Sequence, residues 1–116
     1  MQRILIVEDH KKIREELATF LERNGYQALT LESFDRVVED ALRLEPDLLL
    51  LDINLPDADG FYICKEVRKR SDIPIVIVTS RDTEMDELMS MNLGADDFIT
   101  KPYHAQILLA LSLIHI

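Results

Sequence analysis

The sequence is short of cysteine, of basic residues and of long apolar runs, and each shortage excludes a class of protein. Cys64 is the single cysteine among 116 residues, so no intrachain disulfide can form, and a reducing cytoplasm is the simplest setting. Thirteen basic residues face 22 acidic ones, and the net charge of −9 argues against a nucleic-acid-binding face. No apolar run approaches the ~20 residues that cross a bilayer. We therefore expect one cytoplasmic domain without membrane contact.

The most informative stretch is the apolar run at residues 48–51. Four consecutive leucines are too few for a membrane span, and they are typical of a strand buried on both faces of a parallel sheet. The run ends on a carboxylate, Asp52, which is followed by loop residues. In open α/β sheets, ligands bind beyond the carboxyl ends of the strands. Asp52 is therefore a candidate functional group, and a helix or turn cap is the alternative.

Strands and helices are expected to alternate along the whole chain. The predicted strands cover residues 4–7, 26–31, 48–51, 74–78 and 98–99, and the predicted helices follow at 13–23, from 37 to just before Pro46, 61–70, 83–93 and from 104 onward. Asp82 is the predicted N-cap of the fourth helix, and the third strand is followed by a predicted loop that carries Pro56, Asp57, Asp59 and Gly60. Cys64 shares helical spacing with Phe61 and Val67, which indicates a core position. Strict alternation predicts a three-layer α/β/α sandwich around a five-stranded parallel sheet.

The ends of four predicted strands carry polar groups: Glu8 and Asp9, Asp52, Thr79, and Lys101. Because the carboxyl ends of parallel strands share one edge, we expect these groups to converge. Three clustered carboxylates repel one another unless a cation lies among them, and oxygen ligands suit Mg²⁺. An added ammonium and hydroxyl could hold a phosphoryl group while Asp52 acts as the nucleophile. The alternative is that each group is an ordinary cap, turn or rim residue.

Several other residues could be assigned a functional role, but each has a simpler structural interpretation. His10 lies beside the acidic pair at the start of a helix, where a solvated rim residue is expected. Met85, Met89 and Met91 recur at helical spacing, which indicates packing. Judged from spacing alone, Phe98 is a core aromatic.

Four segments together resemble the receiver domains of two-component response regulators, over essentially the whole chain. They are Ile-Leu-Ile-Val-Glu-Asp at 4–9, Leu-Asp-Ile-Asn-Leu-Pro at 51–56 with Asp-Gly at 59–60, Val-Thr-Ser at 78–80, and Gly-Ala-Asp-Asp-Phe-Ile-Thr-Lys-Pro at 94–102. The resemblance implies a flavodoxin-like strand order, 2-1-3-4-5; this order comes from the family and not from the spacing.

The resemblance also implies a role for each residue at the strand ends. Asp52 would accept a phosphoryl group from a sensor histidine kinase. Asp9 and Asp52 would bind Mg²⁺, with Glu8 acting mostly through water and Asn54 through its backbone carbonyl. The enzymatic chemistry implied is limited to the domain's own phosphorylation and hydrolysis.

The remaining implied roles concern signal transmission. Thr79 would turn toward the phosphate, and Lys101 would pair with it. Phe98 occupies the aromatic switch position, although it lacks the hydroxyl of the tyrosine that is common there. The Lys101–Pro102 bond is expected to be cis.

Three other classes of protein compete with this interpretation. A flavin-binding electron carrier needs a glycine- and hydroxyl-rich loop after the first strand, whereas residues 8–11 read Glu-Asp-His-Lys. A phosphohydrolase of the haloacid-dehalogenase type places an acidic residue two positions after its nucleophile, where this chain has Asn54. The third class is a stand-alone receiver or an unphosphorylated interaction module that acts by protein–protein contact.

The segments at 79–82 and 94–102 are most similar to regulators whose output is a winged-helix DNA-binding domain. Such regulators dimerise through the fourth helix, fifth strand and fifth helix, and we expect the same surface here, although residues 104–116 contain no Arg or Lys. The output domain would lie outside this sequence. Residues 111–116 are nearly all apolar and match one reading of a transposon sequencing adapter, so we expect a truncated chain with a non-native tail.

Overall fold

The computed structural model describes residues 1–56, 58–81 and 83–116, and strands alternate with helices along it. The elements in chain order are β1 (Arg3–Val7), α1 (Lys11–Arg23), β2 (Gln27–Thr30), α2 (Val37–Leu44), β3 (Leu48–Leu51), β4 (Asn54–Leu55), β5 (Ala58–Asp59), α3 (Gly60–Arg70), β6 (Ile75–Thr79), α4 (Glu84–Asn92), β7 (Asp97–Thr100) and α5 (Ala105–His115).

Five strands form one parallel sheet in the order β2-β1-β3-β6-β7. Once the short β4–β5 pair is set aside, this is the predicted order 2-1-3-4-5, which is therefore confirmed. In the register of the sheet, Val7 lies opposite Leu51, and Leu51 lies opposite Ile77. The carboxyl ends of β1, β3 and β6 consequently finish side by side.

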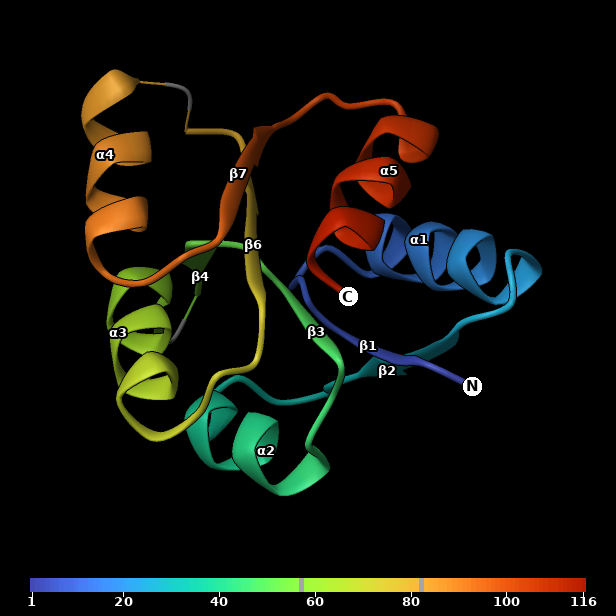
Figure 1. Cartoon of the computed structure of the whole chain (residues 1–116), viewed down its shortest axis with the longest axis horizontal. Coiled ribbons are helices and arrows are strands. Elements are labelled where there is room, and N and C mark those ends of the chain that lie inside the picture. Colours follow the sequence, from blue (N-terminus) through green and yellow to red (C-terminus); the bar gives the residue numbers. More distant parts are fainter. Residues whose placement is uncertain (57, 82) are drawn as a thin grey trace.

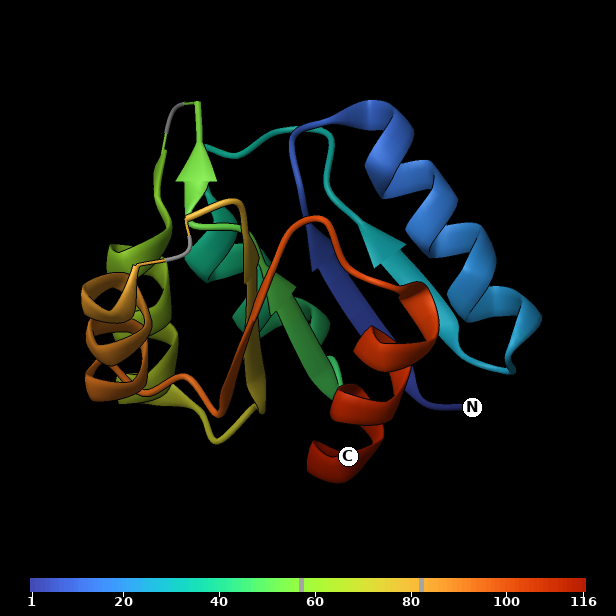
Figure 2. The ribbon, with the colours of Figure 1, turned by 90° about the horizontal axis from the view of Figure 1, so that it is seen from above.

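Helices cover both faces of the sheet, which confirms the three-layer prediction. Helices α1 and α5 lie together on one face, and α2, α3 and α4 lie on the other (Figures 1 and 2). Two separate apolar cores follow from this arrangement. Leu17, Leu21 and Leu108 pack beneath α1 and α5, whereas Val38 and Val67 belong to the core beneath α2 and α3.

The leucine run of β3 supplies both cores at once. Leu48 and Leu50 belong to the core on the α1–α5 side, and Leu49 and Leu51 belong to the opposite core. All four side chains are at most 2% exposed. Full burial of one leucine contributes about 1.5–3 kcal/mol to folding. A central strand buried on both faces explains why the run shows no apolar–polar alternation.

The segment that follows Asp52 is more ordered than the predicted loop. Residues of β4 and β5 form an antiparallel pair in which Asn54 lies opposite Asp59 and Leu55 lies opposite Ala58. The loop prediction was wrong because backbone pairing and the burial of Leu55, which is 8% exposed, stabilise two strands too short to show a periodicity. Asp57, which the prediction also placed in this loop, lies outside the described residues.

Helix α4 differs from the prediction in the environment of its methionines. Met85, Met89 and Met91 are 71%, 48% and 41% exposed, so the interpretation of these side chains as packed was wrong. Helical spacing places them on α4, but among the described residues no neighbouring element covers them. The predicted cap, Asp82, lies outside the described residues, and Thr83 Oγ1 accepts a hydrogen bond from Asp86 N at 3.1 Å.

Helix α5 packs its middle against α1 and leaves its apolar end partly uncovered. Leu108 and Ser112 are buried, whereas Leu113 and Ile114 are 49% and 73% exposed. Apolar groups on more than one side of a surface helix cannot all be buried by the domain beneath it. Within the described ranges, no helix is both long enough and apolar enough to cross a bilayer.

Cys64 provides a test of the core beneath α3. The thiol is fully buried, and burial raises its pKa to about 11. Only the thiolate reacts readily with alkylating reagents, so roughly one folded molecule in a thousand carries the reactive form at pH 8. We expect iodoacetamide at pH 8 to leave the folded protein unmodified, as followed by mass spectrometry.

The matched control is the same protein at the same pH in concentrated urea, where Cys64 regains an ordinary pKa near ~8.5 and should be alkylated rapidly. Equal alkylation rates in the presence and absence of urea would show that the thiol is not held in the core.

Candidate functional site

The carboxyl ends of β1 and β3 are held together by the backbone. Asp52 N donates to Val7 O at 3.0 Å, which extends the β1–β3 pairing by one residue beyond the last strand pair. Glu8 follows Val7 directly, so the two carboxylates leave neighbouring strands at the same edge of the sheet. The predicted convergence of Glu8 and Asp52 is therefore present.

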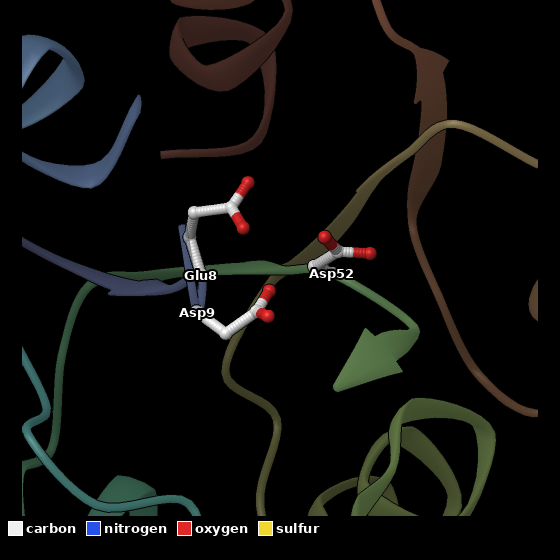
Figure 3. A group of neighbouring side chains, drawn as sticks. All are labelled: Glu8, Asp9 and Asp52. Carbon is white, nitrogen blue, oxygen red and sulfur yellow. The ribbon is translucent and has the colours of Figure 1, made fainter. Parts of the chain in front are cut away.

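Three carboxylates gather at this edge. Glu8, Asp9 and Asp52 each place an oxygen within 4.8 Å of the oxygens of the other two (Figure 3). Glu8 and Asp52 are only 5% and 6% exposed, whereas Asp9 is exposed. The cluster is thus partly buried, and it is open to solvent on the side of Asp9.

Lys101, which follows β7, offsets the charge of the two buried carboxylates. Its Nζ forms an ion pair with Glu8 Oε1 and lies 3.0 Å from Asp52 Oδ2. Burial raises the pKa of Glu8, and hydrogen bonds from Lys101 and from His10 N only partly offset this. Burial alone would lower the pKa of Lys101, but its interactions with Glu8 and Asp52 prevail and raise that pKa above its usual value.

Backbone amides hold the remaining carboxylate oxygens. Asp52 Oδ1 accepts from Asn54 N at 2.9 Å, and Glu8 Oε2 accepts from His10 N at 3.1 Å. The His10 side chain is exposed and caps α1, as a rim residue should. These bonds fix both carboxyl groups in orientation, because each donor lies only two residues after its carboxylate in the chain.

Thr79 and Lys101 are joined through the backbone at the ends of β6 and β7. Lys101 N donates to Thr79 O at 2.8 Å, and the Lys101–Pro102 peptide bond is cis. The Thr79 side chain is fully buried, and its Oγ1 accepts from Arg81 N at 3.3 Å. The hydroxyl is therefore engaged with the β6–α4 loop in this structure.

Phe98 lies in β7, opposite Ile77 of β6. Its side chain is partly buried and packs against the core on the α2–α3 side. The interpretation of Phe98 as a core aromatic therefore agrees with its packing. Its position one strand away from Thr79 leaves the switch role as a proposal.

Gly60 permits the close packing of α3 against the Asp52 loop. A Cβ added at this position would lie 2.2 Å from Ile53 Cα and 2.8 Å from Asp52 O. These distances are too short for any side chain, so only glycine lets the helix begin here. The sequence singled out Asp59-Gly60 as a motif, but the backbone contact behind it could not be predicted.

Sequence reasoning also missed a cavity beside the cluster. It has a volume of about 600 Å³ and lies between α1 and the segment that follows β7, and the lining includes Ile13, Phe20, Lys101, Pro102 and Tyr103. The spacing of Ile13 and Phe20 on one side of α1 was the available signal, but periodicity alone does not distinguish a buried side chain from one that lines a cavity.

The donor set at this edge fits a hard cation. Within the described part of the chain, the group consists of carboxylate oxygens from Glu8, Asp9 and Asp52, without a sulfur or imidazole ligand. Such oxygens suit Mg²⁺, which keeps several waters and takes few protein ligands. The exposed Asp9 is the carboxylate that a hydrated ion can reach most directly.

Comparisons with known proteins point to one family. The sequence model of the response regulator receiver domain matches residues 4–112. The chain is 44% identical over 110 residues to the transcriptional regulatory protein YxdJ of Bacillus subtilis, and 41% identical over 110 residues to the sensory transduction protein BceR of Halalkalibacterium halodurans. Each alignment covers 95% of this chain and 48% of the relative, so the chain spans about half the length of these curated relatives.

Solved structures agree with this result. The BeF3-activated N-terminal receiver domain of Klebsiella pneumoniae RstA superposes with a TM-score of 0.92 at 35% identity, covering 98% of this chain and 97% of that one. The N-terminal domain of the nisin resistance regulator NsrR gives a TM-score of 0.89 at 37% identity, with 99% and 97% covered.

Proposed function

The chain belongs to the response regulator receiver family, and from this premise we propose that it is a phosphorylation-controlled switch with Asp52 as the phosphoacceptor. A sensor histidine kinase donates the phosphoryl group. The observation that carries the proposal is the cluster at the sheet edge: three carboxylates whose oxygens lie within 4.8 Å of one another, with Lys101 Nζ 3.0 Å from Asp52 Oδ2.

The transfer step needs a nucleophile and a group that accepts the negative charge of the phosphoryl oxygens. A carboxylate oxygen of Asp52 attacks phosphorus, the bond between phosphorus and the kinase's histidine nitrogen breaks, and that nitrogen keeps the electron pair. Lys101 already contacts Asp52, so a small side-chain movement brings its ammonium to a phosphoryl oxygen. The Thr79 hydroxyl donates to another.

Mg²⁺, when bound, offsets the charge of the carboxylates and of the phosphoryl oxygens. Asp9 and Asp52 would hold it directly. Glu8 would act through water, as the family resemblance implies. The family resemblance implies the backbone carbonyl of Asn54 as a further ligand, and Asn54 is connected to the cluster by the hydrogen bond from its N–H to Asp52 Oδ1.

Signal transmission proceeds by a shift between two conformations. Attraction of the Thr79 hydroxyl toward the phosphoryl group vacates space near the end of β6. Phe98, in the adjacent strand, turns into that space. The surface formed by α4, β7 and α5 thereby changes its preference for a partner.

The cavity beside α1 suits the kinase. A phosphohistidine must reach Asp52 from the open side of the cluster, so the kinase has to cover the carboxyl edge of the sheet. Ile13 and Phe20 line the cavity there and offer apolar area to a helix of the kinase. The proposed kinase contact therefore lies on the opposite face of the sheet from the proposed dimer surface on α4.

The output is transcriptional, through a DNA-binding region that lies outside this sequence. Relatives such as YxdJ are about twice the matched length and carry the description of transcriptional regulatory proteins. The net charge of −9 means that DNA contacts have to come from elsewhere. The setting we propose is the cytoplasm. A stand-alone receiver that acts by protein contact is the alternative function.

Labelling with acetyl phosphate tests the phosphoacceptor and the metal together. With Mg²⁺, intact-mass spectrometry should show one added phosphoryl group, which Asp52→Asn removes. EDTA should abolish labelling, and Asp9→Asn, which removes a proposed direct ligand, should slow it by at least the ~10–100-fold that loss of a partner behind a ligand costs a metal site. Asp72→Asn, which removes an exposed carboxylate, is the matched control and should label normally.

Undiminished labelling of Asp52→Asn would remove Asp52 from its role. Equal labelling in Mg²⁺ and in EDTA would contradict the metal site while leaving Asp52 as the acceptor.

The surface of α4, β7 and α5 is proposed to form a symmetric dimer after activation. Met85 and Leu88 of α4 and Ile107 of α5 are 71%, 54% and 53% exposed, and apolar exposure of this kind marks interaction surfaces.

Beryllofluoride-loaded protein should show twice the monomer mass by light scattering, and Leu88→Ser should return it to the monomer. The matched control is Tyr62→Ser on α3, where the tyrosine is 58% exposed. A loaded wild-type sample that stays monomeric at high concentration contradicts this surface.

A further inference from the structure

Arg81 joins three parts of the structure that the proposed switch leaves unconnected. Its guanidinium carbon lies 5.5 Å from the ring centroid of Phe61, in the first turn of α3. Its Nη1 lies 3.6 Å from Asp86 Oδ1, in the first turn of α4. Its backbone N–H donates to Thr79 Oγ1. One residue therefore contacts α3, α4 and the side chain that is proposed to sense the phosphate.

The contact with Phe61 is the stronger of the two side-chain contacts. A guanidinium within about 6 Å of a ring centroid is attracted to the negative face of the ring. The pair with Asp86 is long and its arginine side chain is 44% exposed, so this pair alone contributes little. The pair instead orients the guanidinium toward the start of α4, because Asp86 is already held there by a 2.7 Å hydrogen bond from Thr83 Oγ1.

Resting on the proposed function, we propose that Arg81 is a positioning residue that holds the start of α4 against α3 while Thr79 accepts its backbone N–H. We call the contacts of Arg81 with Phe61, Asp86 and Thr79 the α4 latch. Movement of Oγ1 toward a phosphoryl oxygen breaks its hydrogen bond with Arg81 N. This loosens the loop that carries the guanidinium and weakens its contacts with the ring of Phe61 and with Asp86. The start of α4 is then freed, and α4 carries the proposed dimer surface.

Arg81 consequently sets how often α4 is released before any phosphate arrives. Its contacts exist only in the held conformation, so their loss raises the population of the released one. A cation–π contact of ordinary strength at a partly exposed site changes such an equilibrium roughly two- to five-fold.

Amide hydrogen exchange of the unphosphorylated protein measures this population directly. Arg81→Ala and Phe61→Leu, which keeps an apolar side chain but removes the ring, should each speed exchange of the α4 amides (Glu84–Asn92) roughly two- to five-fold. Thr79→Val should do the same, and Thr79→Val combined with Arg81→Ala should add nothing further. Lys65→Ala, which removes an exposed cation of α3, is the matched control and should leave α4 unchanged.

Beryllofluoride binding supplies the second measurement. Arg81→Ala should tighten beryllofluoride binding by the same factor that it speeds exchange, because the variant no longer has a latch to break. If the amide exchange rates of α4 are unchanged in Arg81→Ala or in Phe61→Leu, the proposal that Arg81 holds α4 is wrong. An equal effect of Lys65→Ala also overturns it, since net charge would then be the cause.

The failure of the proposed function is distinguishable from the failure of the latch. Wild-type protein that acetyl phosphate leaves unlabelled contradicts the proposed function, and the exchange measurement still decides whether Arg81 holds α4. Exchange that responds to Arg81→Ala but not to Thr79→Val overturns the link between the latch and the phosphate site.

Discussion

The pairing of Lys101 with Glu8 and Asp52 is the interaction on which the rest of the site depends. The side chains of both carboxylates are only 7% exposed, and a buried charge costs several kcal/mol unless a counter-charge lies beside it. Because Lys101 directly follows β7 and the two carboxylates directly follow β1 and β3, these ion pairs also tie together strands that end at this edge. The core of four leucines in β3 brings Asp52 to that position, and the ammonium of Lys101 lies 3.0 Å from Asp52 Oδ2 to offset its charge.

The same interaction gives the proposed phosphoryl signal a physical basis. In the proposed reaction, phosphorylation replaces one carboxylate of the cluster with a more highly charged group, and Lys101 and Thr79 are the side chains proposed to respond. Thr79 is linked to Lys101 through its carbonyl and to Arg81 through its hydroxyl. In the proposed mechanism, movement at Asp52 would therefore reach the β6–α4 loop, and from there α4, through contacts already present.

Much of this arrangement could be predicted from the sequence, because the signals are local. The leucine run at residues 48–51 fixed the central strand, and polar residues at the ends of four strands indicated the site. The strand order came from the family resemblance. The exposed methionines of α4 were misjudged, since spacing places a side chain on a helix but does not show what covers it. Other features depend on contacts between segments of the folded chain, which local sequence patterns do not reveal. These features are the β4–β5 pair, the close approach at Gly60 and the contacts of Arg81.

The most direct test of the central claim is the thermal unfolding of wild type and Lys101→Met with and without Mg²⁺. Without metal, the variant leaves Glu8 and Asp52 uncompensated and should unfold at a lower temperature, by about 4–8 °C for each kcal/mol lost. Mg²⁺ should raise the Tm of the variant more than that of the wild type, because the metal then provides the charge compensation that Lys101 provided. Equal Tm values without metal, or the same Mg²⁺-induced increase in both proteins, would contradict the account.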